Sequence, residues 1–104
     1  MDTVALRYAE ALFALAKEEN AIKQYQKDME AVEAVFHDKS ILQFFSHVAI
    51  QDEDKYQVLK QSFHGKIQTY VYQFLLLLIK KRRIQCVLLL CQQFQQLCYD
   101  ALGI

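Results

Sequence analysis

The stretch that decides the fold is YVYQFLLLLI, residues 70–79, which is closed by the basic run KKRR, residues 80–83. Wound as a helix, it is apolar on almost every side, and Gln73 is the main polar interruption. Such a helix must be covered by its own domain, by a partner or by lipid. Only residues 74–79 are uninterrupted apolar, far short of the ~20 residues that span a bilayer. We therefore expect no direct membrane insertion.

The composition favours one all-helical domain. The chain has 104 residues, of which 54% are hydrophobic, with no proline and two glycines. A β-rich fold of this size would need several tight turns, and such turns recruit glycine, proline and asparagine. We therefore predict an all-α fold, a compact six-helix bundle that forms a single domain over residues 1–104.

The formal charge is zero at neutral pH but is unevenly spread along the chain. Residues 1–54 carry a net charge of −6 and residues 55–104 a net charge of +6. In a compact bundle the two halves attract each other, which favours closure. Because a nucleic-acid-binding domain is more often basic overall, the neutral chain gives little support to that class.

Cysteine usage and the N-terminal sequence indicate a reducing compartment. The three cysteines are an odd number and all fall between residues 86 and 98, unlike the spaced, even set of a disulfide framework. The N-terminus also lacks the charged, apolar and cleavage regions of a signal peptide and the Arg- and Ser-rich look of a transit peptide. We expect a cytoplasmic protein that is mature from Met1.

Apolar periodicity divides the chain into six helical segments. Breaks are expected where capping residues or glycine gather, around Asp38 and Gly65. The expected helices cover residues 3–19, 21–37, 41–47, 51–63, 66–80 and 84–102. The first of them has a narrow polar face, and its alanines let another backbone approach closely.

The sequence contains no pattern typical of catalysis or metal binding. His37, His47 and His64 each fall at a helix end, with no recurring nucleophile–base pattern around them. Cys91 and Cys98 share a helical face but lack the pair or histidine spacing that zinc sites use. We expect buried apolar cysteines, no cofactor, no metal site and no enzyme.

The basic run Lys80-Lys81-Arg82-Arg83 has two interpretations. A helix end places cations against its own dipole, whereas a phosphate-binding patch would make this a small helical nucleic-acid-binding domain. Without interleaved aromatics in a neutral chain, the helix-end interpretation is favoured. A cysteine-dependent enzyme is a third alternative, which a thiol-reactive probe can test.

Two of the expected helices, residues 3–19 and 66–80, carry more apolar surface than one core contact requires. A domain this small has room for about one fully enclosed helix, so the second should leave an apolar strip outside. Such strips mark partner sites. We therefore hypothesise a groove between the first and fifth helices that accepts an amphipathic partner helix.

At residues 7–16, the sequence RYAEALFALA resembles the R-Y-A-x-A-L-F-x-L-A opening of the F-type ATP synthase delta subunit family. The mitochondrial equivalent is the oligomycin-sensitivity-conferring protein. Residues 52–63 resemble the fourth helix of that family, and QFLLLL at residues 73–78 resembles its N-F-L-x-L-L segment. The ending at residues 102–104 resembles the Gly-Ile that closes the N-terminal domain, so the likeness covers essentially all 104 residues.

The chain departs from the family pattern at two places. The family usually has Asn-Gly before Arg83, where Lys81 and Arg82 stand here. A left-handed cap at this turn is therefore either lost or made by a non-glycine residue. The family's subunit is also much longer and contacts the b subunits through a C-terminal portion, so this chain resembles an isolated N-terminal domain.

The resemblance implies a non-catalytic stator component of a proton-translocating ATP synthase. In the family, the domain sits at the top of the catalytic head, binds the N-terminal helix of an alpha subunit between its first and fifth helices, and links the head to the peripheral stalk. The resemblance also implies a peripheral position on the cytoplasmic face of a bacterial membrane and no nucleic-acid partner. Motif positions carry the partner contact over to five residues of this chain, Tyr8, Ala11, Leu12, Gln73 and Leu77.

Overall fold

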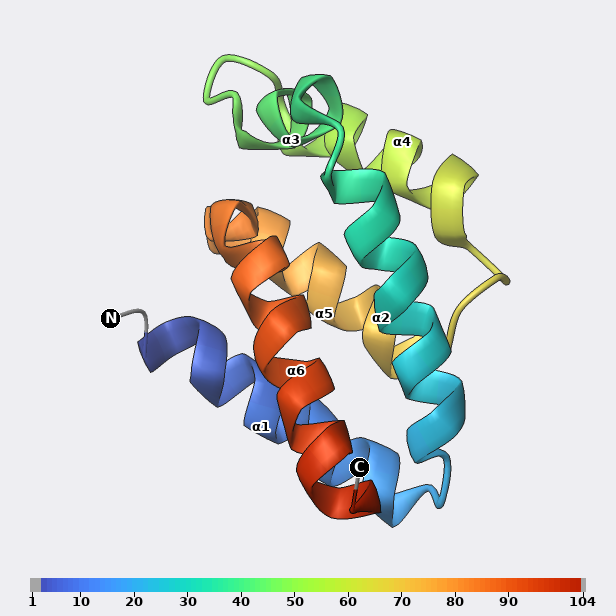
Figure 1. The fold of residues 1–104 in the computed structure, drawn as a ribbon. Coiled ribbons are helices and arrows are strands. Elements are labelled where there is room, and N and C mark those ends of the chain that lie inside the picture. The colour runs from blue at the N-terminus through green and yellow to red at the C-terminus, as the bar shows by residue number, and fades with distance from the viewer. Residues whose placement is uncertain (1–2, 104) are drawn as a thin grey trace.

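The computed structural model describes residues 3–103, and within that range the chain forms six α-helices and one short 3-10 helix, with no strand (Figure 1). The elements are α1 (Thr3–Glu18), α2 (Ile22–Phe36), α3 (Lys39–Ser46), α4 (Asp52–Phe63), α5 (Thr69–Lys80), η1 (Ile84–Cys86, 3-10) and α6 (Val87–Leu102). The predicted all-α six-helix bundle is confirmed. Ile104, which is part of the family-like ending, lies outside the described residues.

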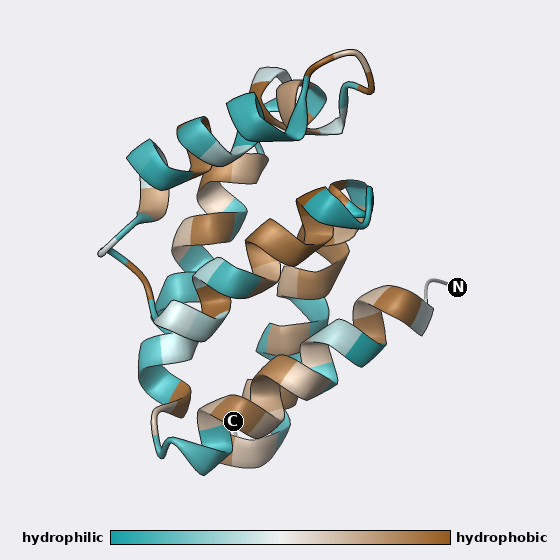
Figure 2. Cartoon of the chain, turned by 180° about the vertical axis from the view of Figure 1, so that it is seen from behind, coloured by the Kyte–Doolittle hydropathy of each residue, from teal (hydrophilic) through white to brown (hydrophobic). Residues whose placement is uncertain are grey.

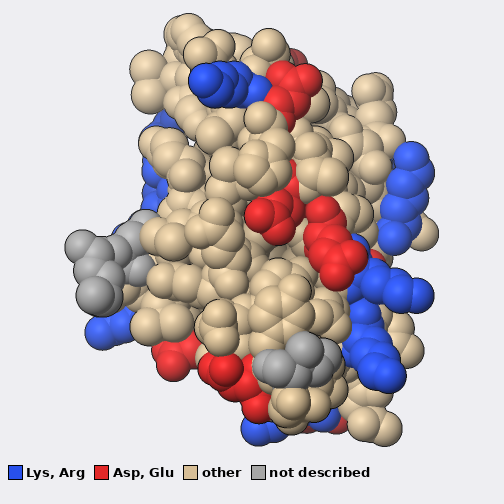
Figure 3. Space-filling model, viewed as in Figure 1, with Lys and Arg blue, Asp and Glu red and all other residues tan. Residues whose placement is uncertain are grey.

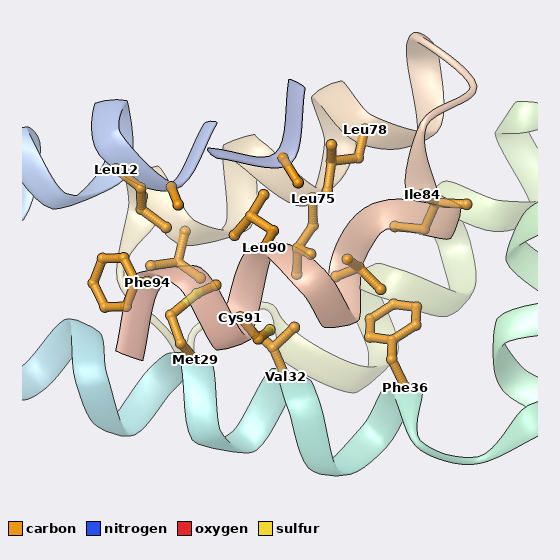
Figure 4. Packing of buried hydrophobic residues seen from close by; sticks show 14 of the residues in the cluster. Leu12, Met29, Val32, Phe36, Leu75, Leu78, Ile84, Leu90, Cys91 and Phe94 are labelled. Carbon is orange, nitrogen blue, oxygen red and sulfur yellow. The ribbon is translucent and has the colours of Figure 1, made fainter. Parts of the chain in front are cut away.

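Helix α6 lies in the middle of the bundle and packs mainly against α1 on one side and α2 on the other (Figure 4). On α1, three fully buried alanines, Ala5, Ala9 and Ala16, leave room for a close approach of the two helices. Phe13 of α1 meets Phe94 of α6 edge to face, with ring centroids 6.1 Å apart. Close packing of α1 on α6 therefore forms the base of the fold.

Helix α5 is enclosed on one side only. Its inner face buries Val71, Leu75, Leu78 and Ile79, whereas Gln73 on the opposite face is exposed. Seen from behind, the hydrophobic ribbon of α5 lies between α4 and α1 (Figure 2). An over-hydrophobic helix that leaves part of its apolar surface outside is what the sequence predicted.

The segment before α5 is extended, so this helix begins at Thr69 and not at the predicted Lys66. Gly65 has the left-handed backbone conformation (φ +77°) that ends α4 and turns the chain. The Gln68 backbone N–H then donates a hydrogen bond of 2.7 Å to Oδ2 of Asp28 on α2. Because this bond holds Gln68 outside the helix, it delays the start of α5.

The end of α5 is a Schellman motif built without glycine. The Arg83 N–H donates to the Leu78 carbonyl at 2.8 Å, and the Arg82 N–H donates to the Ile79 carbonyl at 3.1 Å. Arg82 itself is left-handed, with φ +58°, so the cap is made by a non-glycine residue. Asn20 takes the same conformation (φ +56°) at the end of α1, where asparagine is better tolerated.

The turn between α1 and α2 is tied down by a buried phenol. Tyr25 is fully buried, and its hydroxyl donates a hydrogen bond to Oε1 of Glu19. Burial, and then the bond to Glu19, raise the pKa of Tyr25 above its ordinary value. The neutral hydroxyl therefore joins the first two helices across the turn at all ordinary pH values.

Direct ion pairs contribute little to closure of the bundle. Among residues 3–103, Arg82 and Asp52 are the one Lys or Arg and carboxylate pair within reach, at 4.0 Å. Both side chains are partly exposed, and such pairs stabilise proteins by ~0–1 kcal/mol. The predicted attraction between the two halves is represented by this single contact, and burial of apolar side chains dominates the fold.

The strained cap at Arg82 predicts a stabilising substitution. Because a left-handed conformation costs a non-glycine residue about 1–2 kcal/mol, Arg82→Gly should raise the free energy of unfolding by about 1 kcal/mol. Urea denaturation measures this change. Arg82→Ala is the matched control, because it loses the same contact with Asp52 but keeps the strain, and it should give no stabilisation. Equal stabilities for the two variants would contradict the strain at this position.

The Asp28 carboxylate predicts a pH-dependent stability. Burial raises the pKa of Asp28 above its ordinary value, partly offset by the Gln68 hydrogen bond. The folded state therefore holds the proton more tightly, and stability is lost as the pH rises from ~3.9 through the raised pKa. Asp28→Asn keeps an acceptor for Gln68 and removes the titration.

Urea unfolding of both proteins between pH 3.5 and 7 checks this sign. The stability of Asp28→Asn relative to the natural protein should increase with pH, whereas a constant difference would contradict it. Asp28→Ala should be destabilised by about 1–3 kcal/mol, because the Gln68 N–H loses its acceptor.

Candidate partner-binding surface

Tyr8 joins the outer edges of α1 and α5. Its ring packs edge to face on Phe74, with centroids 6.0 Å apart and planes at 89°. Its hydroxyl accepts a hydrogen bond of 3.3 Å from Nη1 of Arg83, just beyond the end of α5. Both Tyr8 and Phe74 are half-buried. The side chain therefore has a fixed position while part of it faces solvent.

Ala11 and Leu77 extend this surface along the two helices. Ala11 is exposed and follows Tyr8 by three residues, so both lie on one face of α1. Leu77 is half-buried and follows Phe74 by three residues on α5, and the exposed Gln73 precedes it by four. We call these five residues, Tyr8, Ala11, Gln73, Phe74 and Leu77, the α1–α5 surface. It contains four of the five residues expected from the resemblance.

Leu12, the fifth expected contact residue, is not on this surface. Its side chain is 0% exposed and points into the core toward Phe94 (Figure 4). The reason is its helical position, three residues after Ala9 and four before Ala16, which are both buried. Leu12 supports α1 from beneath, and we leave it out of the surface that a partner could touch.

A second hollow flanks α5 on its other side and was not predicted from the sequence. A groove of about 510 Å³ runs between α4 and α5, lined by Tyr56, Tyr72 and Leu76 together with Gln73 and Leu77. The sequence pattern placed Tyr56 with the buried Leu59 and Phe63, but its ring is only half-buried. The crest of α5, at Gln73 and Leu77, thus borders surfaces on both sides.

The basic run is accounted for by the end of α5. Lys80 is the last helical residue, and Arg82 forms the left-handed turn. Arg83 donates to Tyr8, and Arg82 contacts Asp52. These local contacts agree with the helix-end interpretation, and Arg83 acquires a further role in fixing Tyr8.

The cysteines have the properties of core residues. Cys91 and Cys98 are fully buried on α6. Burial raises the pKa of Cys91 to about 12 and that of Cys98 to about 11. A nucleophilic cysteine needs a lowered pKa and an accessible thiolate, so this environment is the opposite of a reactive one.

The histidines are separated from one another and serve local contacts. His37 lies 3.6 Å from Glu33 on the same helix, Nδ1 of His47 accepts from the Ala49 N–H at 3.1 Å, and His64 stacks edge to face on Tyr72. Within the part of the chain that the structure describes, no group of three His, Cys, Asp or Glu side chains is placed to hold a metal ion. Over the same residues, each helix is too short or too polar to cross a membrane.

The fold and surface define a helical-bundle domain that presents apolar and small side chains on the outside of two neighbouring helices. The family model described as "ATP synthase delta (OSCP) subunit" matches residues 4–104. The chain therefore belongs to the ATP synthase delta (OSCP) subunit family.

Curated relatives named ATP synthase subunit delta agree with this assignment. The protein of Halalkalibacterium halodurans is 34% identical over 99 residues, covering 94% of this chain and 54% of the relative. That of Thermosynechococcus vestitus is 37% identical over 91 residues, covering 86% of this chain and 49% of the relative. That of Symbiobacterium thermophilum is 33% identical over 102 residues, covering 97% and 55%. The chain thus spans about half the length of these relatives.

The buried thiols predict low reactivity in the folded protein. At pH 8 an aromatic disulfide reagent should label at most one cysteine, the half-buried Cys86, because Cys91 and Cys98 are inaccessible and protonated. All three should react after unfolding in guanidinium chloride. Rapid labelling of two or three thiols in the native protein would contradict the structure and revive a cysteine-based activity.

Proposed function

We propose that this chain is a non-catalytic stator component of an F-type ATP synthase. In this proposal the α1–α5 surface binds the N-terminal helix of an alpha subunit and thereby links the catalytic head to the peripheral stalk. Membership of the delta (OSCP) family supports the setting. The observation that carries the proposal is the exposed Ala11 beside half-buried Tyr8, Phe74 and Leu77 on two packed helices.

These residues fit a helix-in-groove mode of recognition. An amphipathic helix anchors apolar side chains spaced at i, i+3, i+4 and i+7 in a hydrophobic groove. Ala11 has a small side chain, so a partner backbone could lie close to α1 there, while Tyr8 and Leu77 offer apolar walls. Gln73 is the exposed polar group that could orient the guest through its amide. Each partner side chain would then replace water on a surface that is already apolar.

The proposal extends to position but not to every partner. A stator component that binds the catalytic head would occupy a peripheral position on the cytoplasmic face of a bacterial membrane. The family resemblance assigns contacts with the b subunits to a C-terminal portion, so the binding proposed for this chain is confined to the alpha-subunit helix. The nucleic-acid alternative gains no support, because the arginines of the basic run make contacts within the chain.

A peptide titration tests this function. A synthetic peptide of an alpha-subunit N-terminal helix should bind the natural protein, and Ala11→Asp should weaken binding at least tenfold, because it places a charge in an apolar contact. Isothermal titration calorimetry measures both affinities. The variant should still fold, since Ala11 is exposed.

Ala31→Asp is the matched control, because Ala31 is an exposed alanine on α2 with the same loss of helix propensity. It should bind the peptide as the natural protein does. No binding of the natural protein at high micromolar peptide, or equal weakening by the two substitutions, would contradict the proposed site.

A further inference from the structure

The groove between α4 and α5 is the largest apolar hollow adjoining an exposed helix crest in the described part of the chain. Its volume is about 510 Å³, and its apolar lining comes from Tyr56, Tyr72, Leu76 and Leu77. Past Tyr72 and Leu76 it continues into a second hollow of about 300 Å³ beside Ile67, at the start of α5. The α1–α5 surface lies on the opposite side of α5, so it does not account for this groove.

The length of the groove matches a short helix. It follows α5 from Thr69 to Lys80, a helix of 12 residues, which measures ~18 Å and makes about three turns at 1.5 Å per residue. A partner helix of three to four turns would present two or three apolar anchors to such a groove. The side chains that project from Tyr56 and Tyr72 are suited to contact these anchors with large rigid faces.

The charges at the groove indicate the sign of the partner. Lys60 and Lys80 both border it, and no acidic side chain is among its lining residues. Lys60 lies near the end of α4 and Lys80 at the end of α5, so the antiparallel pair places them toward opposite ends of the groove. Neither ammonium has a carboxylate within 4.0 Å among the described residues. An acidic partner would therefore find an unpaired cation near each end.

The face seen in Figure 1 has the opposite character. There, acidic side chains gather over the region between α2 and α6 (Figure 3). An acidic helix would be repelled from that face and attracted to the α4–α5 groove. The distribution of charge thus selects both the sign of the ligand and the side of the molecule to which it binds.

We propose that the α4–α5 groove is a second docking site, which binds a short amphipathic helix with apolar anchors on one face and an acidic residue near each end of its polar flank. The proposal does not depend on binding at the α1–α5 surface, because its lining comes from the α4 side of α5. Only Gln73 and Leu77 on the crest border both sites. The domain could then hold two helices at once, one on each side of α5.

Nuclear magnetic resonance with designed peptides tests this site. The probe is a 14-residue helical peptide with leucine at i, i+3, i+4 and i+7 and two flanking glutamates seven residues apart. Its amide-shift changes should centre on Tyr56 and Leu76 and leave Tyr8 and Ala11 unchanged. The same peptide with glutamine in place of both glutamates should bind roughly three- to tenfold more weakly, as expected for two solvent-exposed ion pairs.

Protein variants provide the reciprocal measurement. Lys60→Gln combined with Lys80→Gln should weaken the acidic peptide by the same factor and leave the glutamine peptide unaffected. Lys23→Gln combined with Lys27→Gln on α2 is the matched control, since both lysines are exposed, and should change neither affinity.

Three results would overturn the proposal. They are no shift changes at millimolar peptide, shift changes that map to the α1–α5 surface alone, and affinities that ignore the charges of both peptide and groove. Concentration-dependent shifts at Tyr56 and Leu76 without peptide, together with a doubled mass in sedimentation, would show instead that the groove binds a second copy of the chain.

Discussion

The close approach of α1 to α6 is the contact on which the rest of the structure depends. Fully buried alanines at positions 5, 9 and 16 allow it, and Leu12 with Phe94 fills the space between the helices. Interiors pack at near-crystalline density, so a larger side chain at any of these alanines would push the helices apart. With α1 and α2 on either side of α6, the central helix of the bundle is α6, and α5 is left toward the outside.

That arrangement explains why a strongly apolar helix remains partly uncovered. The inner face of α5 is used by the core, while its outer crest meets α1 on one side, through Tyr8 and Phe74, and α4 on the other. Further packing within 104 residues is not available to cover the crest. The uncovered apolar surface is therefore a consequence of how α1 and α6 pack, and it is what a partner helix would bury.

Much of this fold could be predicted from periodicity and capping, because helix faces and Asp38 or Gly65 breaks are local signals. Long-range contacts could not be. The start of α5 depends on Asp28, forty residues away from Gln68 in sequence. Lys55 is 3% exposed, although lysine in an acidic first turn is normally solvated. Leu12 matched the family motif for partner contact, yet its burial follows from which face of α1 meets α6, and one helix alone does not reveal that.

Paramagnetic relaxation tests most directly the claim that the faces of α1 and α5 turned away from the core form a docking surface. A spin label is attached to the centre of a synthetic alpha-subunit N-terminal helix, which is added to isotope-labelled protein. The predicted result is broadening of the amide signals of Ala11 and Leu77 while that of Ala31 on α2 stays sharp. Broadening centred on α2 or α3, or none at saturating peptide, would contradict the claim.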